Sequence, residues 1–501
     1  MFRQAMWDEP LLCELSKKGR RAYSLPELSR EFKKHADLDQ SIPQSMRRST
    51  ALNLPELSEP EIIRHFLRLS QMNFAIDLGM YPLGSCTMKY NPKVSQRIAR
   101  DPKIALLHPY QDEQTIQGIL EILAELERYL CEIAGMDRFS LAPAAGAQGE
   151  YVGDLIIRNN LVDRDLEGKD EMLVPDSAHG TNPASAAMAG FKVVKIPSSQ
   201  DGIVTSEAVK QVISNRTAGM MLTVPNTLGI FEREIVEVSK IIHERDGLMY
   251  YDGANMNALL GRVRPGDMGF DIVHINVHKT FATPHGGGGP GAGPVGVTKQ
   301  LSDYLPVPTI EETPEGKYRF DYDRPKSIGF IKSFYGNIAV LLRAYCYILS
   351  LGSNGLREVS EQAVLASNYL LSLIDAEAFS TPFMRGTPRK HEFVISASPL
   401  KKKTGVSAGD VAKSILDSGM HSPTTYFPLI VPEALMVEPT ETEPVENLER
   451  YARTLNDIAK RSKENKEEVL DSPRSTAIGR LDEYKASHPS SMILRWKKEA
   501  K

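Results

Sequence analysis

The chain has 501 residues, more than one hydrophobic core usually contains, and the typical size of domains predicts two or three packed units. Hydrophobic residues make up 41% of the chain and charged residues 25%, which argues against disorder and against membrane insertion. The formal net charge is -4 and no basic stripe alternates with aromatic residues, so we expect no nucleic-acid partner.

The cysteines and the N-terminal segment indicate the cellular environment. The four cysteines are widely spaced: Cys13, Cys86, Cys131 and Cys346. They form no cluster with the spacing of a zinc site, so we expect no bound metal and a reduced, intracellular chain. The first residues mix Arg3 with Asp8 and Glu9, and no stretch approaches the roughly 20 apolar residues of a spanning helix. We expect a cytoplasmic protein that binds no membrane.

Residues 1–115 are polar and are interrupted repeatedly by prolines between Pro43 and Pro109, which predicts an N-terminal arm with a loop-rich lead-in. A helix with apolar residues at a spacing of four follows, through Ile122, Leu126 and Leu130. It leads to a glycine-rich turn at residues 144–149.

Short apolar segments then alternate with helical patterns. The predicted strands are residues 172–174, 192–196, 220–224, 248–251 and 271–277, and the predicted helices between the later strands are 206–214 and 234–245. Such alternation predicts an α/β fold with a mostly parallel sheet flanked by helices on both faces. Ligands of these sheets bind outside the carboxyl ends of the strands.

The last third of the chain predicts a smaller α+β domain. Its predicted helices are residues 336–351, 359–374 and 408–417, and its predicted strand is 392–396. We therefore divide the chain into an arm and lead-in (1–115), a large α/β domain (116–335) and a C-terminal α+β domain with a charged tail (336–501).

Lys279 ends a row of apolar side chains. If residues 271–279 form a strand, Val273, Ile275 and Val277 share one face with Lys279. Desolvation there favours the neutral amine, which is the form that attacks aldehydes. A lysine that extends its ammonium from a strand end to water fits the same pattern.

Asp252 closes the preceding predicted strand, so it can face the same crevice as Lys279. A carboxylate that keeps a pyridine nitrogen protonated, opposite a lysine, is the recurring arrangement of pyridoxal phosphate (PLP) enzymes. An aspartate that only forms a turn before Gly253 is the alternative. We take Lys279, Asp252 and the adjacent His278 as candidate catalytic residues, and we expect Ala254 and Asn276 to contact the cofactor.

Two further segments could hold such a cofactor. Gly146, Ala147 and Gln148 begin an apparent helix, whose first N–H groups attract a phosphate dianion. His179 follows a predicted strand, where its imidazole could stack on the pyridine ring or satisfy loop carbonyls.

A separate glycine-rich run at residues 284–291 matches the spacing GxGxxG. Pro290 and Pro294 prevent the helix that a dinucleotide site needs, and the lysine of a Walker motif is missing. We interpret the run as a tightly turned or mobile loop beside Lys279.

Five longer segments resemble the glycine decarboxylase P-protein family. They are residues 81–92 (YPLGSCTMKYNP), 177–183 (SAHGTNP), 251–255 (YDGAN), 277–281 (VHKTF) and 421–428 (HSPTTYFP). The resemblance extends over roughly residues 55 to 450. In this family the protein is either one chain of about twice this length or two subunits, and this chain resembles the PLP-bearing second subunit.

The resemblance implies a PLP-dependent transferase of fold type I, with the cofactor aldehyde on Lys279. It implies that glycine is decarboxylated and that its aminomethyl group passes to the lipoyl arm of an H-protein. It also implies a partner, subunit 1, in a heterodimer or heterotetramer. Residues 81–92 are placed near the cleft, where Cys86 is either an ordinary thiol or redox-active. Either Lys279 or His278 could handle protons.

Two alternatives remain open at this point. Another PLP enzyme of the same fold, an amino-acid decarboxylase or aminotransferase, would share Asp252 and Lys279. A scaffold subunit that has lost its cofactor would lack the lysine.

Overall fold

The computed structural model describes residues 3–35, 42–50, 52–108, 111–286, 291–383 and 386–492. Its contacts divide the chain into two compact units, which are described separately. The N-terminal unit consists of residues 1–75 with 416–419 and 471–501, and the main unit consists of residues 76–415 with 420–470. The division at residues 115 and 335 stays a prediction. No helix among the described residues is long and apolar enough to cross a membrane.

The N-terminal unit contains short helices and one longer one: α1 (Leu12–Leu15), α2 (Arg30–His35), α4 (Glu59–Gln71) and α18 (Glu483–Ser487). The sequence of α4 explains where it begins. Ser58 and Glu61 form a capping box that satisfies N–H groups of the first turn, and Pro60 lies in that turn, where no N–H is needed.

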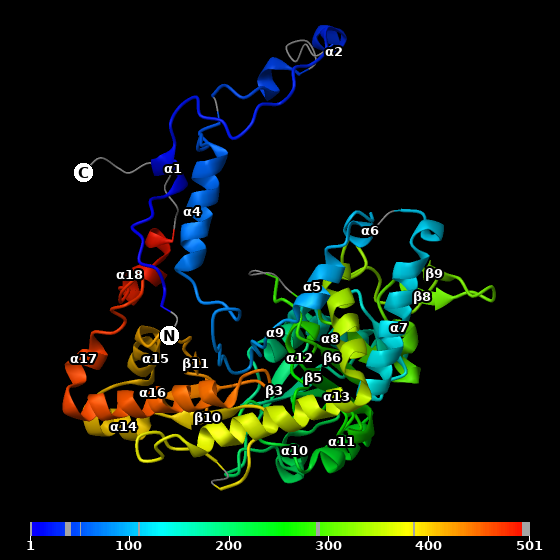
Figure 1. Cartoon of the computed structure of the whole chain (residues 1–501). Coiled ribbons are helices and arrows are strands. Elements are labelled where there is room, and N and C mark those ends of the chain that lie inside the picture. The colour runs from blue at the N-terminus through cyan, green and yellow to red at the C-terminus, as the bar shows by residue number, and fades with distance from the viewer. Residues whose placement is uncertain are drawn as a thin grey trace. The chain divides into compact units, whose positions relative to one another are not determined.

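A seven-stranded sheet forms the centre of the main unit (Figure 1). Its strands are β1 (Arg138–Ser140), β2 (Glu171–Pro175), β3 (Lys192–Ile196), β4 (Thr217–Leu222), β5 (Leu248–Gly253), β6 (Ile272–Ile275) and β7 (Val295–Val297). They lie in the order β1-β7-β6-β5-β4-β2-β3, and β7 alone runs antiparallel to its neighbours. The predicted mostly parallel sheet is confirmed.

Helices cover both faces of this sheet, as the alternating pattern predicts. The first face packs against α7 (Gln117–Ala134), α10 (Ser206–Val212), α11 (Ile235–His243) and part of α13 (Ile338–Ser372). The second face packs against α8 (Gly146–Asp163) and α9 (Thr181–Met188). Strand alternation decides which residue meets which layer: Tyr251 belongs to the first core and Tyr250 to the second.

The prediction of a strand over 271–277 was wrong at its end. Strand β6 stops at Ile275, and Val277–Thr280 form the short helix α12. The carbonyl of Asn276 accepts the N–H groups of Lys279 and Thr280 at 3.0 and 3.2 Å, which closes a helical turn. Lys279 therefore does not continue the apolar face of the strand, because the two-residue alternation ends where the helical turn begins.

The sequence also missed β1 and β7. Each has three residues, and β7 lies in a segment rich in glycine and proline, which suggests a loop when only local pattern is considered. Their pairing along 138–140 and 295–297 stabilises both strands and closes the sheet beside β6.

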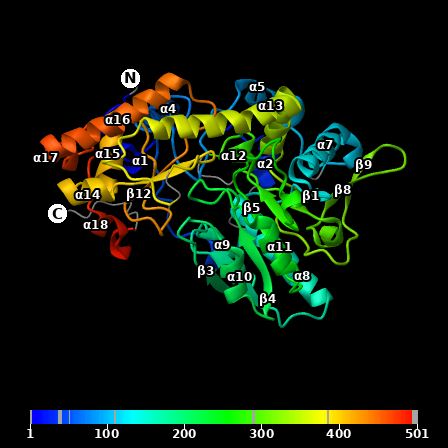
Figure 2. The same ribbon diagram turned by 90° about the horizontal axis from the view of Figure 1, so that it is seen from below.

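The C-terminal part of the main unit contains a three-stranded antiparallel sheet, β10 (Phe393–Ser396), β12 (Ala434–Val437) and β11 (Thr424–Thr425). Its helices are α14 (Ser398–Thr404), α15 (Ala408–Asp417), α16 (Val445–Glu464) and α17 (Lys466–Leu470). Helix α13 packs against both α7 and α16, and so joins the two sheets (Figures 1 and 2). The two predicted helices in this region are one element with a kink at Gly352, whose φ of 61° is not helical.

Smaller elements of the main unit are the helices α5 (Lys93–Ala99) and α6 (Pro102–Ala105) and the hairpin of β8 (Thr309–Glu312) and β9 (Tyr318–Asp321).

Glycines set the distance between α8 and the second face of the sheet. A Cβ atom at Gly153 would lie 2.1 Å from Cε2 of Tyr250, and one at Gly149 would lie 2.7 Å from the Gly293 carbonyl. Tyr250 cannot move aside easily, because it is fully buried and its hydroxyl lies 2.6 Å from Nδ1 of His274. Helix α8 can therefore approach the sheet this closely because Gly149 and Gly153 have no side chains.

We predict that Gly153→Ala destabilises the chain by about 1–3 kcal/mol, the usual cost of overpacking a core. Gly168→Ala is the matched control, because a Cβ there has no heavy atom within 4 Å. Thermal or denaturant unfolding of both variants measures the difference. Equal stability of the two variants would contradict the packing argument.

Candidate active site

A cavity of 270 Å³ lies at the carboxyl ends of the parallel strands, and we call it the Lys279 cavity. Its volume is near the lower end for small-molecule sites, about 300 Å³. Eight of the nine residues singled out from the sequence line it: Gly146, Ala147, His179, Asp252, Ala254, Asn276, His278 and Lys279. The structure therefore brings these residues together at the edge that the rule for ligands of parallel sheets indicates.

Lys279 extends from α12 into this cavity and is half-buried. Its Nζ donates a hydrogen bond to the Ser85 carbonyl at 2.7 Å. Ser85 and Cys86 also line the cavity, so the segment 81–92 lies at the cleft, where the resemblance places it. Burial raises the pKa of the Cys86 thiol, which favours the protonated, unreactive form of an ordinary cysteine.

Asp252 is a buried carboxylate at the end of β5, with 2% of its surface exposed. It accepts hydrogen bonds from the Ala254 N–H at 3.0 Å and from the Asn182 amide at 3.1 Å. Burial by itself raises the pKa of Asp252. The neighbouring His274, these two donors and the Lys279 ammonium outweigh burial, and the pKa falls below its ordinary value. The group is therefore an anion held inside the protein.

Behind Asp252 lie groups that the sequence did not indicate. The register of β5 and β6 sets Asp252 opposite His274, whose Nε2 is 3.5 Å from Oδ1 of Asp252. Burial lowers the pKa of His274 to about 4, so its ring is neutral at pH 7. Glu150 shares the Asn182 amide with Asp252. Burial, followed by the charge of Asp252, raises the pKa of Glu150 to about 9, so this carboxyl is protonated.

Helix α8 begins at Gly146, as the sequence predicts, and its N-cap residue Ala145 offers no side-chain hydrogen bond. The N–H groups of the first turn have no partner within a helix, so they are available to an anion. A Cβ at Gly146 would lie 2.4 Å from Oδ1 of Asn276, which requires glycine at this position. The side chain of Gln148 does not line the cavity, since its amide bonds the Ala144 N–H and the Ile331 carbonyl.

His278 and His285 pack edge to face, with ring centroids 4.8 Å apart. Burial, with the nearby His285 and Lys279, lowers the pKa of His278 to about 3. A Cβ at Gly291 would lie 2.1 Å from Nδ1 of His278, so this glycine permits the close approach expected of the glycine-rich run. Residues 287–290 of that run lie outside the described residues.

His179 lies at the mouth of the cavity and is exposed. Its Nδ1 accepts a hydrogen bond from the Thr181 N–H at 3.3 Å and contacts the Thr181 hydroxyl. The imidazole and the Phe427 ring form a T-shaped contact, with centroids 5.7 Å apart. His179 lines the cavity, so an aromatic cofactor could contact its ring there.

His391 and Glu392 also line the cavity, although no sequence pattern indicated them as site residues. They come from the start of β10, which belongs to the C-terminal sheet. A charged residue before a strand is ordinary in a sequence. Only the packing of the two sheets brings these side chains to Lys279.

The chemistry of this cavity fits PLP. Lys279 supplies an amine, Asp252 supplies a buried anion for a pyridinium nitrogen, and the first turn of α8 supplies N–H groups for a phosphate. The buried Oδ1 atoms of Asn182 and Asn276 have no partner among the described residues, as expected of a site that binds a polar ligand.

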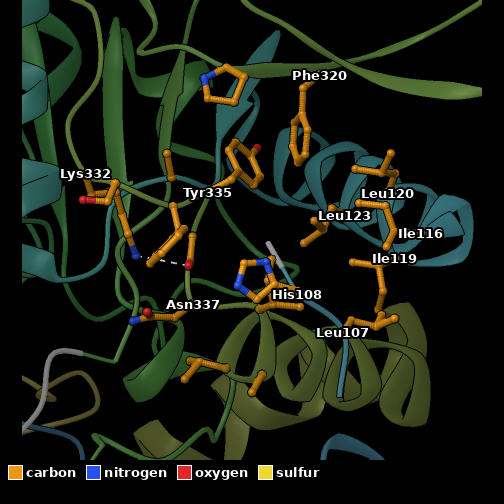
Figure 3. Close-up of a pocket in the computed structure, with 18 of the residues that line it drawn as sticks. Leu107, His108, Ile116, Ile119, Leu120, Leu123, Phe320, Lys332, Tyr335 and Asn337 are labelled. Atoms are coloured by element: carbon orange, nitrogen blue, oxygen red, sulfur yellow. Dashed lines mark hydrogen bonds between the residues drawn. The ribbon is translucent and has the colours of Figure 1, made fainter. Parts of the chain in front are cut away.

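A larger cavity of 690 Å³ lies elsewhere in the main unit (Figure 3). It is lined mainly by apolar side chains such as Leu120, Leu123 and Phe320, and Lys332 at its edge donates to the Gly336 carbonyl at 3.1 Å. Its described lining includes no carboxylate that could pair with a pyridine nitrogen. The smaller cavity is therefore the candidate active site.

The protonated state of Glu150 predicts how the stability of the folded chain changes with pH. Its pKa is about 9 in the folded chain and 4.5 ordinarily. Between these values the unfolded chain releases the proton and the folded chain keeps it, so a rise in pH favours unfolding. We predict that Glu150→Gln stabilises the cofactor-free chain relative to wild type increasingly from pH 5.5 to 8.5, by up to about 1.4 kcal/mol per pH unit.

Denaturant unfolding at several pH values measures this difference. Glu207→Gln, at an exposed position of α10, is the matched control and should not change the slope. If the free energies of unfolding of Glu150→Gln and wild type change equally with pH, the Glu150 carboxyl is not protonated in the folded chain.

Comparison with known proteins agrees with this geometry. Residues 32–314 match the model of the glycine cleavage system P-protein family, and residues 359–477 match the C-terminal domain of glycine dehydrogenase. A probable glycine dehydrogenase (decarboxylating) subunit 2 from Pyrococcus furiosus is 58% identical over 100% of this chain and 99% of its own length. A relative with the same description from Caldanaerobacter subterraneus is 53% identical over 97% of this chain and 99% of its own.

Solved structures show the same fold at low identity. An inhibitor-bound glycine decarboxylase (P-protein) of the glycine cleavage system matches with a TM-score of 0.73 and 20% identity, covering 87% of this chain and 99% of that one. A C-DES mutant with glycine covalently linked to its PLP cofactor matches with a TM-score of 0.58 and 14% identity, covering 76% and 96%. The predicted PLP-dependent fold type I is confirmed. By sequence and by fold, the chain belongs to the glycine cleavage system P-protein family.

Proposed function

We propose that this chain is the PLP-bearing subunit of a glycine decarboxylase, which removes the carboxyl group of glycine and passes the aminomethyl group to the lipoyl arm of an H-protein. The observation that carries the proposal is the meeting of Lys279 and Asp252 in one cavity, in a chain whose relatives are named glycine dehydrogenase subunit 2. That name supports a partner subunit. We propose a heterodimer or heterotetramer with this partner. We also propose a cytoplasmic location, which agrees with the archaeal and bacterial relatives.

PLP, when bound, supplies an electron-accepting ring that takes up the electron pair left when glycine loses carbon dioxide. Asp252 would serve this chemistry, because its buried negative charge would keep a pyridine nitrogen protonated. Because the protein already satisfies this carboxylate with the Ala254 N–H and the Asn182 amide, Asp252 needs no reorganisation when the cofactor binds.

Lys279 is the nucleophile of the cavity, and its Nζ binds the cofactor aldehyde. Its hydrogen bond to the Ser85 carbonyl sets the amine at the cavity wall. Lys279 is also the better candidate for moving protons, because the low pKa of His278 makes that ring a weak base at pH 7. The role left for His278 is to position the backbone of Ala292, whose N and carbonyl oxygen both lie 3.2 Å from its Nδ1.

The remaining side chains position the substrate and exclude water. The α8 turn would hold the phosphate, and His179 would cover one face of the ring. The segment around Ser85 and Cys86 forms a wall of the cavity and so limits access of water to the reacting carbon.

The proposed function predicts exchange of labelled bicarbonate into the carboxyl group of glycine. The purified chain is mixed with its partner subunit, PLP, lipoylated H-protein and glycine, and label in glycine is counted. Omission of the H-protein is the control and should reduce exchange strongly. No exchange with all components present would refute the function.

We further predict that borohydride fixes the cofactor to Lys279. In wild type, peptide mass analysis after reduction should find the added cofactor mass on the peptide that contains Lys279, and Lys279→Ala should abolish both this mass and the visible absorbance band. Lys332→Ala, which removes the lysine at the edge of the other cavity, is the matched control and should retain both. An unchanged band in Lys279→Ala would refute the assignment.

A further inference from the structure

Two buried carboxyl groups, Glu392 and Glu438, lie together at one end of the C-terminal sheet. Glu392 immediately precedes β10 and Glu438 immediately follows β12, and the pairing of Phe393 with Val437 brings them side by side. Their surfaces are 4% and 1% exposed. One oxygen of each and a ring nitrogen of His391 lie within 4.8 Å of one another.

This pair is connected to Lys279 by the segment at residues 85–87. The Ser85 N–H donates to Glu392 at 2.7 Å, while the Ser85 carbonyl accepts from Lys279 at 2.7 Å. The Thr87 N–H donates to Glu438 at 3.1 Å. A single residue therefore separates Glu392 from the amine that binds the cofactor.

The hydrogen bonds around the two carboxyls are unequal. Glu438 accepts from the N–H and hydroxyl of Thr87, from Asn255 at 2.8 Å and from Asn257 at 3.2 Å. Within the described chain, Glu392 accepts one hydrogen bond, from the Ser85 N–H. Donors stabilise the charged form, so the negative charge belongs on Glu438 and the proton on Glu392.

Electrostatics supports the same assignment. Two carboxylates this close cannot both be ionised without a large cost. Burial, and then the charge of Glu438, raises the pKa of Glu392 to about 8. Burial raises the pKa of Glu438 less, because the Thr87 and Asn255 donors, and then the charges of Lys279 and Lys89, oppose it.

The other titratable groups that face the pair are Cys86 and His391. Burial raises the pKa of the Cys86 thiol and lowers that of His391 to about 3, so both groups are neutral at pH 7.

His391 gives a second, independent sign that something binds here. It is 2% exposed, it lines the Lys279 cavity, and neither ring nitrogen has a hydrogen-bond partner among the described residues. A buried polar group without a partner is costly and commonly marks a ligand position. Its Nε2 lies 3.8 Å from Oε1 of Glu392, so a ligand that reaches His391 also reaches this carboxyl.

We propose that Glu392 is a catalytic acid of the aminomethyl transfer and that Glu438 keeps it protonated. This assignment rests on the proposed function. The carbon–carbon bond of glycine breaks, carbon dioxide leaves, and the electron pair stays with the methylene carbon. That pair forms a bond to one sulfur of the lipoyl disulfide, the sulfur–sulfur bond breaks, and its pair goes to the other sulfur. The departing sulfur takes the proton of Glu392 and leaves as a thiol.

The disulfide is thus the oxidant and gains two electrons, and Glu392 regains its proton from water. The acidity of Glu392 suits this step, because a thiol has a pKa near 8.5 and proton transfer is most effective between groups of similar pKa. The neutral His278 and His391 cannot supply a proton as readily at pH 7.

The first test uses the cofactor-free chain and needs no activity. Infrared spectroscopy detects the C=O stretch of a protonated carboxyl. We expect Glu392→Gln to remove one such band at pH 7, and Glu438→Gln to lower the pH at which the Glu392 band titrates, because the neighbouring charge is gone. Glu232→Gln, at a buried carboxyl that does not line the cavity, is the matched control and should leave the Glu392 band unchanged.

The second test measures transfer to lipoylated H-protein with the complete enzyme. Glu392→Gln should lower kcat by about 10²–10⁴-fold, the usual contribution of a general acid. The KM for glycine and the borohydride fixing of PLP on Lys279 should stay close to wild type. Wild-type kcat should fall as the pH rises through about 8, and the variant should lack this fall. Glu232→Gln should behave as wild type.

Four outcomes would overturn the assignment. Retention of every protonated carboxyl band in Glu392→Gln would show that Glu392 is ionised. Parallel loss of cofactor fixing, glycine binding and unfolding midpoint would show a structural role through Ser85. Stoichiometric binding of Mn²⁺ or Zn²⁺ that requires His391, Glu392 and Glu438 would show a metal site. Wild type without bicarbonate exchange refutes the proposed function, whereas equal transfer in wild type and Glu392→Gln refutes the Glu392 assignment alone.

Discussion

The candidate site depends on one constraint, which is that Asp252 remains ionised while almost completely removed from water. Burial alone would raise the pKa of this carboxyl. The Ala254 N–H, the Asn182 amide and nearby positive charge reverse that tendency. The strands position these groups, because β5 ends at the carboxylate and β6 sets His274 against it. Because the pKa of Asp252 is lower in the folded chain than ordinarily, its neighbours more than offset the cost of burying the anion.

The protonated Glu150 is a consequence of the same constraint. Burial and the charge of Asp252 make a second anion unfavourable there. The pKa of Glu150 therefore rises to about 9, and the group is protonated at pH 7. The pair of Glu392, which lines the cavity, and Glu438 behind it repeats this arrangement, because most of the hydrogen-bond donors surround one member, Glu438. Glu150 and Glu392 therefore each hold the proton of a carboxyl pair, beside a partner with a lower pKa.

The segment around Ser85 joins these two walls. Its carbonyl accepts a hydrogen bond from Lys279, on the helix that follows the large sheet's β6, and its N–H donates to Glu392, just before β10 of the C-terminal sheet. Ser85 and Thr87 both have positive φ angles, 64° and 36°, a conformation that side chains disfavour. Glu392 and Glu438 accept the N–H groups of Ser85 and Thr87, and so stabilise this unfavourable turn. The same contacts hold the Ser85 carbonyl where it accepts the Lys279 hydrogen bond.

The sequence by itself determined the fold class, the correct edge of the sheet and most of the residues of the Lys279 cavity. It could do so because strand and helix periodicities are local, and because Asp252, Gly146 and His179 each follow or begin a regular element. It failed at Lys279, where the alternation of a strand was extended into a helical turn formed by the Asn276 carbonyl. The ends of elements depend on such single hydrogen bonds, which sequence patterns do not record.

Tertiary structure alone decided which acids are protonated and which residues from the C-terminal part reach Lys279. Glu392 and Glu438 are 46 positions apart and meet only because β10 and β12 pair in one register, and Ser85 reaches both Glu392 and Lys279 from a third segment. The pKa of a carboxyl depends on burial and on charges within a few ångströms, and those distances exist only after the sheets have packed.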